Sequence, residues 1–139
     1  MTAHCDIVAA KGMVVVYQDS YVADPPQNFT SGVTGFTSSG QRVWSLSLAA
    51  LEGGYSTFLP EGIYTLPDSG NVLLELDRHL YPGEMTLLVL LDSSNGNVLW
   101  WSETSASFFY YPRDAVEGGF MFSCGGNATS SNLTFLTFP

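Results

Sequence analysis

Polar and apolar residues alternate along several short segments of the chain. Across residues 42–48, Trp44, Leu46 and Leu48 are separated by smaller or more polar residues, and residues 72–77 alternate in a similar way. A period of two residues is typical of a β-strand that buries one face. We therefore predict a half-buried strand over residues 42–48, with Trp44 on its buried face, and a further strand over residues 72–77.

Two other segments are almost continuously apolar. Residues 13–17 include three consecutive valines, and residues 85–91 are dominated by leucine. Aliphatic and β-branched runs of this length favour buried strands. The sequence therefore predicts a buried strand at residues 13–17, and a strand in the centre of a sheet at residues 85–91.

Glycine, proline and asparagine separate these runs. The strongest hairpin signal is Asn95-Gly96, because it stands between two β-rich segments and Asn-Gly is a favoured turn sequence. Residues 67–71 predict a second turn. Pro25-Pro26 interrupts the strand pattern, because proline has no backbone N–H to donate.

No segment shows a sustained helical period with capping residues. About 8–10 short strands separated by close turns are typical of an all-β fold. We predict a single domain over residues 1–139, because this length is within the usual size of one domain. The expected architecture is an antiparallel β-sandwich, connected as a jelly roll or an immunoglobulin-like Greek key, with little or no helix.

The charge balance argues against several classes of partner. Thirteen acidic residues and four basic ones give a net charge of −9. Nucleic acids and anionic membranes bind clustered basic residues, whereas Lys11, Arg42, Arg78 and Arg113 are scattered along the chain. No apolar run is long enough to span a membrane. The first residues do not form a basic segment followed by a long apolar stretch, so we expect no signal peptide.

Cys5 and Cys124 lie near opposite ends of the chain. One interpretation is a pair of buried, unpaired thiols. The other is a disulfide between an early and a late strand, which requires an oxidising compartment. The sequence holds neither a Cys-x-x-Cys motif nor a set of zinc ligands at the usual spacing, so we predict no zinc site.

The sequence contains no Gly-x-Ser-x-Gly elbow, so we expect no serine nucleophile of that type. Asp77 and His79 are the best candidates for a hydrolase, but we expect them in a solvated turn. Asp92, Asn95 and Asn97 offer oxygen ligands of the kind that calcium accepts, although Asn-Gly turns usually serve hairpin geometry. We therefore predict no enzymatic activity, no metal and no cofactor.

Residues 87–102, LLVLLDSSNGNVLWWS, resemble one repeat of the bulb-type mannose-binding lectins. The resemblance implies a hairpin of that family and a sugar ligand. In the segment before it, the family's sugar-binding Gln, Asp and Asn are replaced by Glu84, Thr86 and Leu88, and the regularly spaced further repeats are missing. No sugar-binding residue is therefore carried over from the family.

Aromatic residues are concentrated late in the chain. Adjacent aromatic residues lie on opposite faces of a strand, so one face joins the core while the other is open to a partner. The candidate interface consists of Trp100, Trp101, Phe109, Tyr110, Tyr111, Leu136 and Phe138.

These features predict a non-enzymatic structural protein that acts through protein–protein contacts, as a homo-oligomer or within a larger assembly. A virion component fits this combination: a capsid decoration, a minor capsid protein or a protein associated with a tail or fibre. The alternative is a carbohydrate-binding module, with Trp100, Trp101, Tyr110 or Tyr111 stacking on sugar rings. A small hydrolase is the second alternative. The expected location is the virion, and the alternative location is extracellular.

Overall fold

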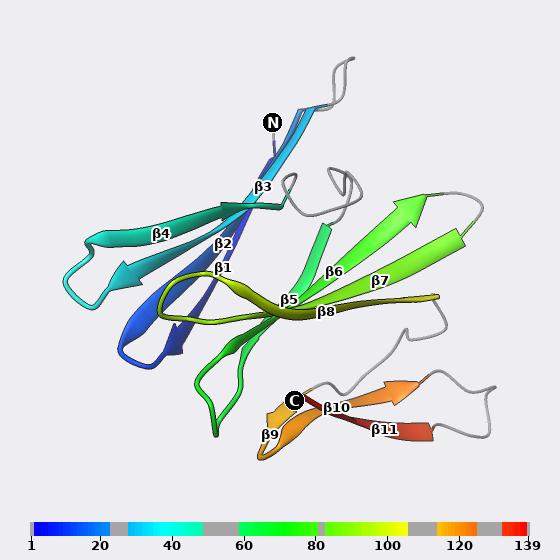
Figure 1. Cartoon of the computed structure of the whole chain (residues 1–139). Coiled ribbons are helices and arrows are strands. Elements are labelled where there is room, and N and C mark those ends of the chain that lie inside the picture. The colour runs from blue at the N-terminus through cyan, green and yellow to red at the C-terminus, as the bar shows by residue number, and fades with distance from the viewer. Residues whose placement is uncertain are drawn as a thin grey trace.

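The structure is a computed structural model that describes residues 2–22, 28–48, 59–80, 83–105, 114–124 and 132–138. These residues form eleven strands and no helical element (Figure 1). All paired strands are antiparallel. The fold is therefore all-β, antiparallel and sandwich-like, as the sequence predicts. The described residues contain no helix with the length and apolarity needed to cross a membrane.

The strands are grouped in three sheets. The first sheet contains β1 (Thr2–Ala10), β2 (Met13–Val22), β3 (Asn28–Thr37) and β4 (Arg42–Ser47). The central sheet contains β5 (Leu59–Thr65), β6 (Val72–Leu80), β7 (Gly83–Leu91) and β8 (Val98–Ser105). The third sheet contains β9 (Asp114–Val116), β10 (Gly119–Cys124) and β11 (Asn132–Thr137).

The connectivity is simpler than the sequence analysis proposes. Within the described residues, each strand pairs with a strand next to it in sequence, so every sheet is a meander. A jelly roll or a Greek key instead brings strands that are distant in sequence side by side. Neither connection is present among the described strands, because tight turns join sequential neighbours there.

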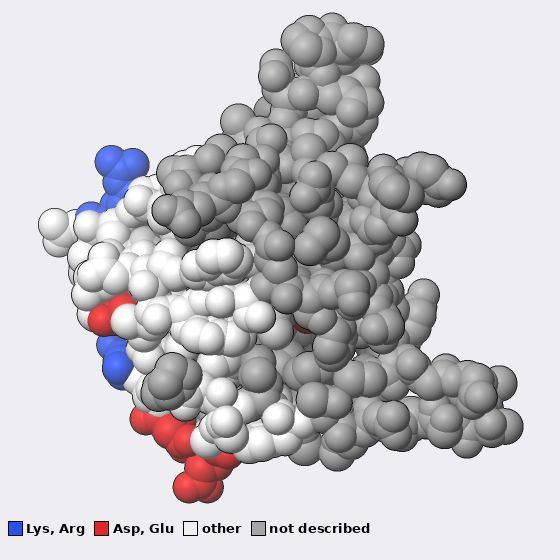
Figure 2. Space-filling view, turned by 45° about the vertical axis from the view of Figure 1, so that its right-hand side comes forward, with Lys and Arg blue, Asp and Glu red and all other residues white. Residues whose placement is uncertain are grey.

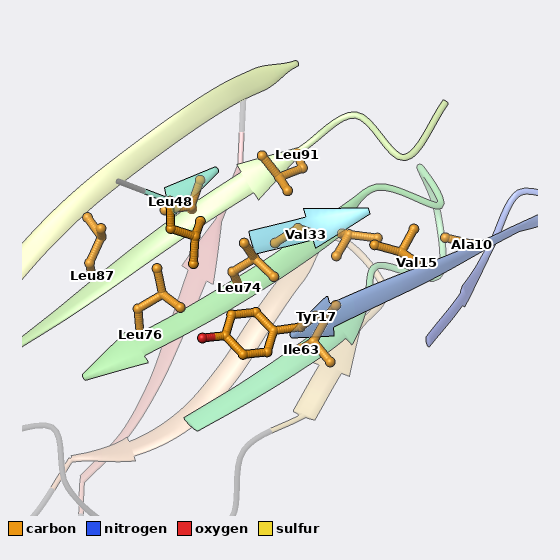
Figure 3. Close-up of a cluster of buried hydrophobic side chains, with 12 residues drawn as sticks. Ala10, Val15, Tyr17, Val33, Leu48, Ile63, Leu74, Leu76, Leu87 and Leu91 are labelled. Carbon is orange, nitrogen blue, oxygen red and sulfur yellow. The ribbon is translucent and has the colours of Figure 1, made fainter. Parts of the chain in front are cut away.

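A first hydrophobic core fills the space between the first and central sheets (Figure 3). Val15, Tyr17 and Val33 of the first sheet face the side chains of Leu74 and Leu76 of the central sheet, and all five are fully buried or nearly so. The two sheets also meet along one edge, where Thr65 Oγ1 of β5 donates a hydrogen bond of 2.8 Å to the backbone oxygen of Ala9 in β1.

A second core lies between the central and third sheets. Leu73, Leu88 and Leu90 of the central sheet pack there with Phe120 of β10. The side chains of β7 alternate between the two cores: Leu87, Val89 and Leu91 join the first core, and Leu88 and Leu90 the second. The prediction of a central strand at residues 85–91 is thereby confirmed, because β7 lies inside its sheet and is covered on both faces.

The tight turns among the described residues lie toward the left and the bottom of the molecule in the view of Figure 1. They join β1 to β2, β3 to β4, β5 to β6, β7 to β8 and β9 to β10. The Asn95-Gly96 hairpin is confirmed as the β7–β8 turn, in which Asp92 N donates to Asn97 O over 2.9 Å and Gly96 N to Asp92 O over 2.8 Å. We call this side of the molecule the turn end.

Candidate interaction surfaces

The outer face of the first sheet, turned away from the first core, carries an apolar patch that no other described element covers. Strand alternation buries Val15 and places Val14 and Val16 on the opposite, outer face. We define the outer patch by its apolar members: Ile7, Val14, Val16, Phe36 and Val43. Ile7 is 58% exposed and Val43 is 51% exposed, so the patch is open at both sheet edges.

Cross-strand pairing brings these apolar residues together in rows. Ile7 of β1 lies opposite Val16 of β2, and Val14 lies opposite Phe36 of β3. Large apolar residues on the exposed face of a sheet mark a surface that other proteins contact. The rows across the face run Cys5–Gln18–Gly32–Ser47, Ile7–Val16–Thr34–Ser45 and Ala9–Val14–Phe36–Arg42.

The outer patch is nearly free of charge. Of the three rows, only the one nearest the turn end includes a charged residue, Arg42, at its margin. Thr34 and Ser45 in the middle row satisfy each other through a hydrogen bond of 3.2 Å between their hydroxyl oxygens. The two hydroxyl groups in the middle of the face are therefore uncharged and bonded to each other.

A second exposed apolar site lies on β8, an edge strand of the central sheet. Leu99 is 50% exposed and Trp101 is 49% exposed. A register shift between Leu90 and Leu91 in the β7–β8 ladder leaves Leu99 without a paired residue. Bulges of this kind protect sheet edges against uncontrolled strand pairing. The exposed pair is thus a small surface beside an interrupted edge.

The predicted aromatic interface is divided by the fold. Trp100 is half-buried between the central and third sheets, where its ring meets that of Phe138 at a centroid distance of 5.4 Å. Trp101, the next residue, is half-exposed, as expected for neighbouring residues on opposite faces of a strand. Leu136 lies in β11 opposite Phe120, and its side chain is outside the described part. Phe109, Tyr110 and Tyr111 also lie outside the described residues.

The interface predicted from the sequence omits four exposed apolar residues: Ile7, Val43, Leu99 of β8 and Phe135 of β11. The signal that locates the first two is the valine run of β2. An unbroken apolar run supplies side chains to both faces of a strand, so its neighbours on the outer face are apolar as well. Phe135 has no comparable signal, because β11 is apolar on both faces and only the fold decides which face is covered.

The polar groups of the β7–β8 turn bind one another. Ser94 donates to Asp92 Oδ1 through its hydroxyl at 2.6 Å and its backbone N–H at 2.9 Å. Asn95 Nδ2 donates to Asp92 Oδ2 at 3.2 Å, while Asn95 Oδ1 accepts from Asn97 N at 2.8 Å. The side-chain oxygens of Asp92 and Asn95, considered as calcium ligands, therefore serve to close the turn.

Hydrogen bonding in this turn stabilises the ionised form of the Asp92 carboxyl. The Ser94 hydroxyl, and then its backbone N–H, lower the pKa of the Asp92 carboxyl below its ordinary value of 3.8, because both stabilise the carboxylate. The positive charge of Lys11 and the Asn95 amide act in the same direction, and partial burial opposes them. Asp92 is therefore ionised at neutral pH and acts as the fixed acceptor of the turn.

Contacts at the turn end tie the three sheets together. Trp44 of the first sheet donates from Nε1 to Ser93 O of the β7–β8 turn over 2.9 Å. The backbone N–H of Gly118, in the β9–β10 turn, donates to Asp68 Oδ2 of the β5–β6 turn. In the view of Figure 2, most charged atoms of the described residues gather along this margin and leave a broad uncharged area beside it.

One carboxylate is buried within the second core. Glu75 of β6 is only 4% exposed, and the Tyr64 hydroxyl donates to its Oε2 at 3.4 Å. The Tyr64 ring also packs against Phe120, with ring centroids 4.8 Å apart. This arrangement joins β5, β6 and β10, and gives the buried carboxyl group a hydrogen-bonding partner, which a buried polar group requires.

The remaining sequence candidates fall at separate places. Cys5 is an exposed, free thiol on β1, so the expectation of a buried thiol is wrong there. Cys124 lies on β10, with its side chain outside the described part. Asp77 and His79 lie within β6 and pair with Thr86 and Glu84 of β7, so they belong to a strand ladder and not to the turn that the sequence predicts.

Comparisons with protein-family models, with curated proteins and with solved structures find no match to this chain.

Proposed function

We propose that the chain is a non-enzymatic assembly protein that acts through protein–protein contacts, as a homo-oligomer or as part of a larger assembly. The observation that carries the proposal is the set of five large apolar residues that are 48–58% exposed: Ile7, Val43, Leu99, Trp101 and Phe135. They lie on both outer sheets and on an edge strand. Exposed apolar surface of this kind is stabilised when a partner removes it from water.

A virion component is the specific form of assembly protein that we favour: a capsid decoration, a minor capsid protein or a protein associated with a tail or fibre. Its support is a meandering β-sandwich with short turns, a net charge of −9 and scattered basic residues. Charge of one sign keeps single copies apart until apolar contacts hold them together. These features are typical of a class of proteins, and the proposal does not depend on a match to a particular family.

Sedimentation equilibrium tests the proposal directly. We expect the mean mass of the purified protein to rise with concentration across the micromolar to millimolar range. The rise should be steeper at high salt, because salt screens the repulsion between acidic copies and strengthens apolar association. A mass that stays at 15.0 kDa at every concentration and salt level would contradict the proposal.

A carbohydrate-binding module remains the second candidate, and Trp101 is the observation that favours it. An indole that is 49% exposed beside an interrupted edge offers a face for stacking against a sugar ring. Binding on a glycan array should then be lost in Trp101→Ala and kept in Leu99→Ala, a matched change at an equally exposed residue of the same strand. An array without signal for the wild-type protein would remove this candidate.

A further inference from the structure

We infer that a second copy of this chain covers the outer patch, with the outer faces of the two first sheets packed against each other. The inference rests on the proposed assembly function and names the surface and the partner. Two twisted sheets packed face to face form a further layer about 10 Å away. In such a contact the apolar side chains of each outer patch fill the space that water occupies in the single copy.

A comparison between β2 and β7 shows that no other described strand covers the outer patch. Both strands contain a nearly continuous apolar run, a pattern typical of strands buried on both faces. The side chains of β7 enter two cores, one on each face. Those of β2 bury Val15 and Tyr17 on the inner face and leave Val14 and Val16 partly open on the outer one. The missing cover is therefore another apolar layer.

The distribution of charge selects a second copy as that layer. A two-fold contact places the same surface of both copies face to face, so a patch with charge of one sign meets charge of the same sign. The rows through Ile7–Val16 and Cys5–Gln18 contain no charged residue, and Arg42 stands only at the margin of the third. A partner selected by the net charge of −9 would instead require acidic groups within the patch.

The size of the patch predicts a weak dimer. Four strands and three rows of side chains cover about 400 Å² of sheet on each copy, from the usual strand spacing and rise. Stable interfaces bury about 800 Å² per partner. We therefore expect association in the micromolar range or weaker, and a rapid exchange between single and paired copies.

Charged substitutions on the outer patch test the inference. Ile7→Lys and Val43→Lys each place a charge on a residue that is more than half exposed in the single copy, so folding should be preserved and near-ultraviolet circular dichroism checks it. Each change also lowers the net negative charge, so weaker association cannot come from added general repulsion. We expect at least a tenfold weaker association by sedimentation equilibrium. Leu99→Lys and Phe135→Lys are the matched controls on other surfaces and should change it less than twofold.

Cys5 supplies a second readout in the unmodified protein, because its free thiol lies on the same outer face, in the row next to Ile7. Its rate of alkylation, followed by mass spectrometry, should fall at least threefold as the protein concentration passes through the association range. In Ile7→Lys the rate should not depend on concentration.

The outcomes separate this inference from the proposed function. If the wild-type protein associates but only the Leu99→Lys or Phe135→Lys variant weakens association, the outer patch is not the contact and the assembly function stands. If association persists in all four variants, the inference is also wrong. If the wild-type protein never associates, both the inference and the proposed function are contradicted.

Discussion

The indole of Trp44 fastens the β7–β8 turn to the first sheet. Its Nε1 donates to Ser93 O at 2.9 Å, and the ring packs at the edge of the first core. A Cβ atom on either Gly35 or Gly96 would overlap this ring, so the indole lies directly against the backbone of β3 and of the turn. One side chain therefore joins two sheets at the turn end.

Removal of this side chain should destabilise the protein strongly. We expect Trp44→Ala to lower the free energy of unfolding by about 3 kcal/mol, because it leaves a cavity and an unpaired carbonyl. Val43→Ala, one residue away on the exposed face, should change it by less than about 0.5 kcal/mol. Urea denaturation of both variants measures the difference, and equal values would show that Trp44 does not join the sheets.

Two turn glycines allow the free-energy cost of backbone strain to be compared with the cost of steric overlap. Gly96 and Gly40 both have positive φ, +75° and +84°, but only Gly96 lies against the Trp44 ring. Gly40→Ala should cost about 1 kcal/mol through its left-handed backbone alone. Gly96→Ala should cost clearly more, because the new methyl group must displace the indole. Thermal unfolding compares the two, and the excess should shrink in a Trp44→Ala background.

The hydroxyl of Tyr64 should stabilise the buried Glu75. Tyr64→Phe keeps the ring against Phe120 but removes the hydrogen bond to the carboxylate. We expect a loss of about 1 kcal/mol in unfolding free energy, since the bond is long. In a Glu75→Leu background the same change should cost less, and a double-mutant cycle measures that coupling. Equal costs in both backgrounds would show that the pair does not interact.

Ser94 should govern the titration of Asp92. In Ser94→Ala the pKa of the Asp92 carboxyl should rise, because the largest cause of its lowering is the Ser94 hydroxyl. Ser93→Ala is the matched control: the Ser93 hydroxyl is buried and has no hydrogen-bond partner within the described structure, so its removal should leave that pKa unchanged. Carbon-detected NMR titration measures the pKa of the Asp92 carboxyl in both variants. A wild-type pKa equal to that of Ser94→Ala would contradict the assignment.

The same carboxylate makes the stability of the fold depend on pH in a definite direction. Because its folded pKa lies below the ordinary value of 3.8, ionised Asp92 stabilises the fold at pH values above 3.8. That contribution is lost as the pH falls through the folded pKa. In acid unfolding, the stability difference between wild type and Ser94→Ala should therefore be present at neutral pH and disappear at the acid end. A stability difference between the two proteins that grows as the pH falls would contradict this prediction.

Local patterns were sufficient to predict strands, faces and one hairpin. The alternation across residues 42–48 placed Trp44, Leu46 and Leu48 on the covered side, and the structure confirms it. Asn95-Gly96 predicted its hairpin because a glycine with positive φ satisfies the backbone of that turn by itself. These features depend on neighbouring residues, so the sequence carries them directly.

The layering could not be predicted, because it depends on which sheet covers which face. The apolar runs of β2 and β7 look alike in sequence, yet β7 lies between two layers and β2 beneath one. The adjacent Trp100 and Trp101 likewise differ only through the third sheet, which covers one of them. The sequence by itself determined where strands form and which side chains share a face, since backbone geometry fixes both. Only the tertiary structure decided which apolar faces stay in contact with water, because that depends on contacts between residues far apart in the chain.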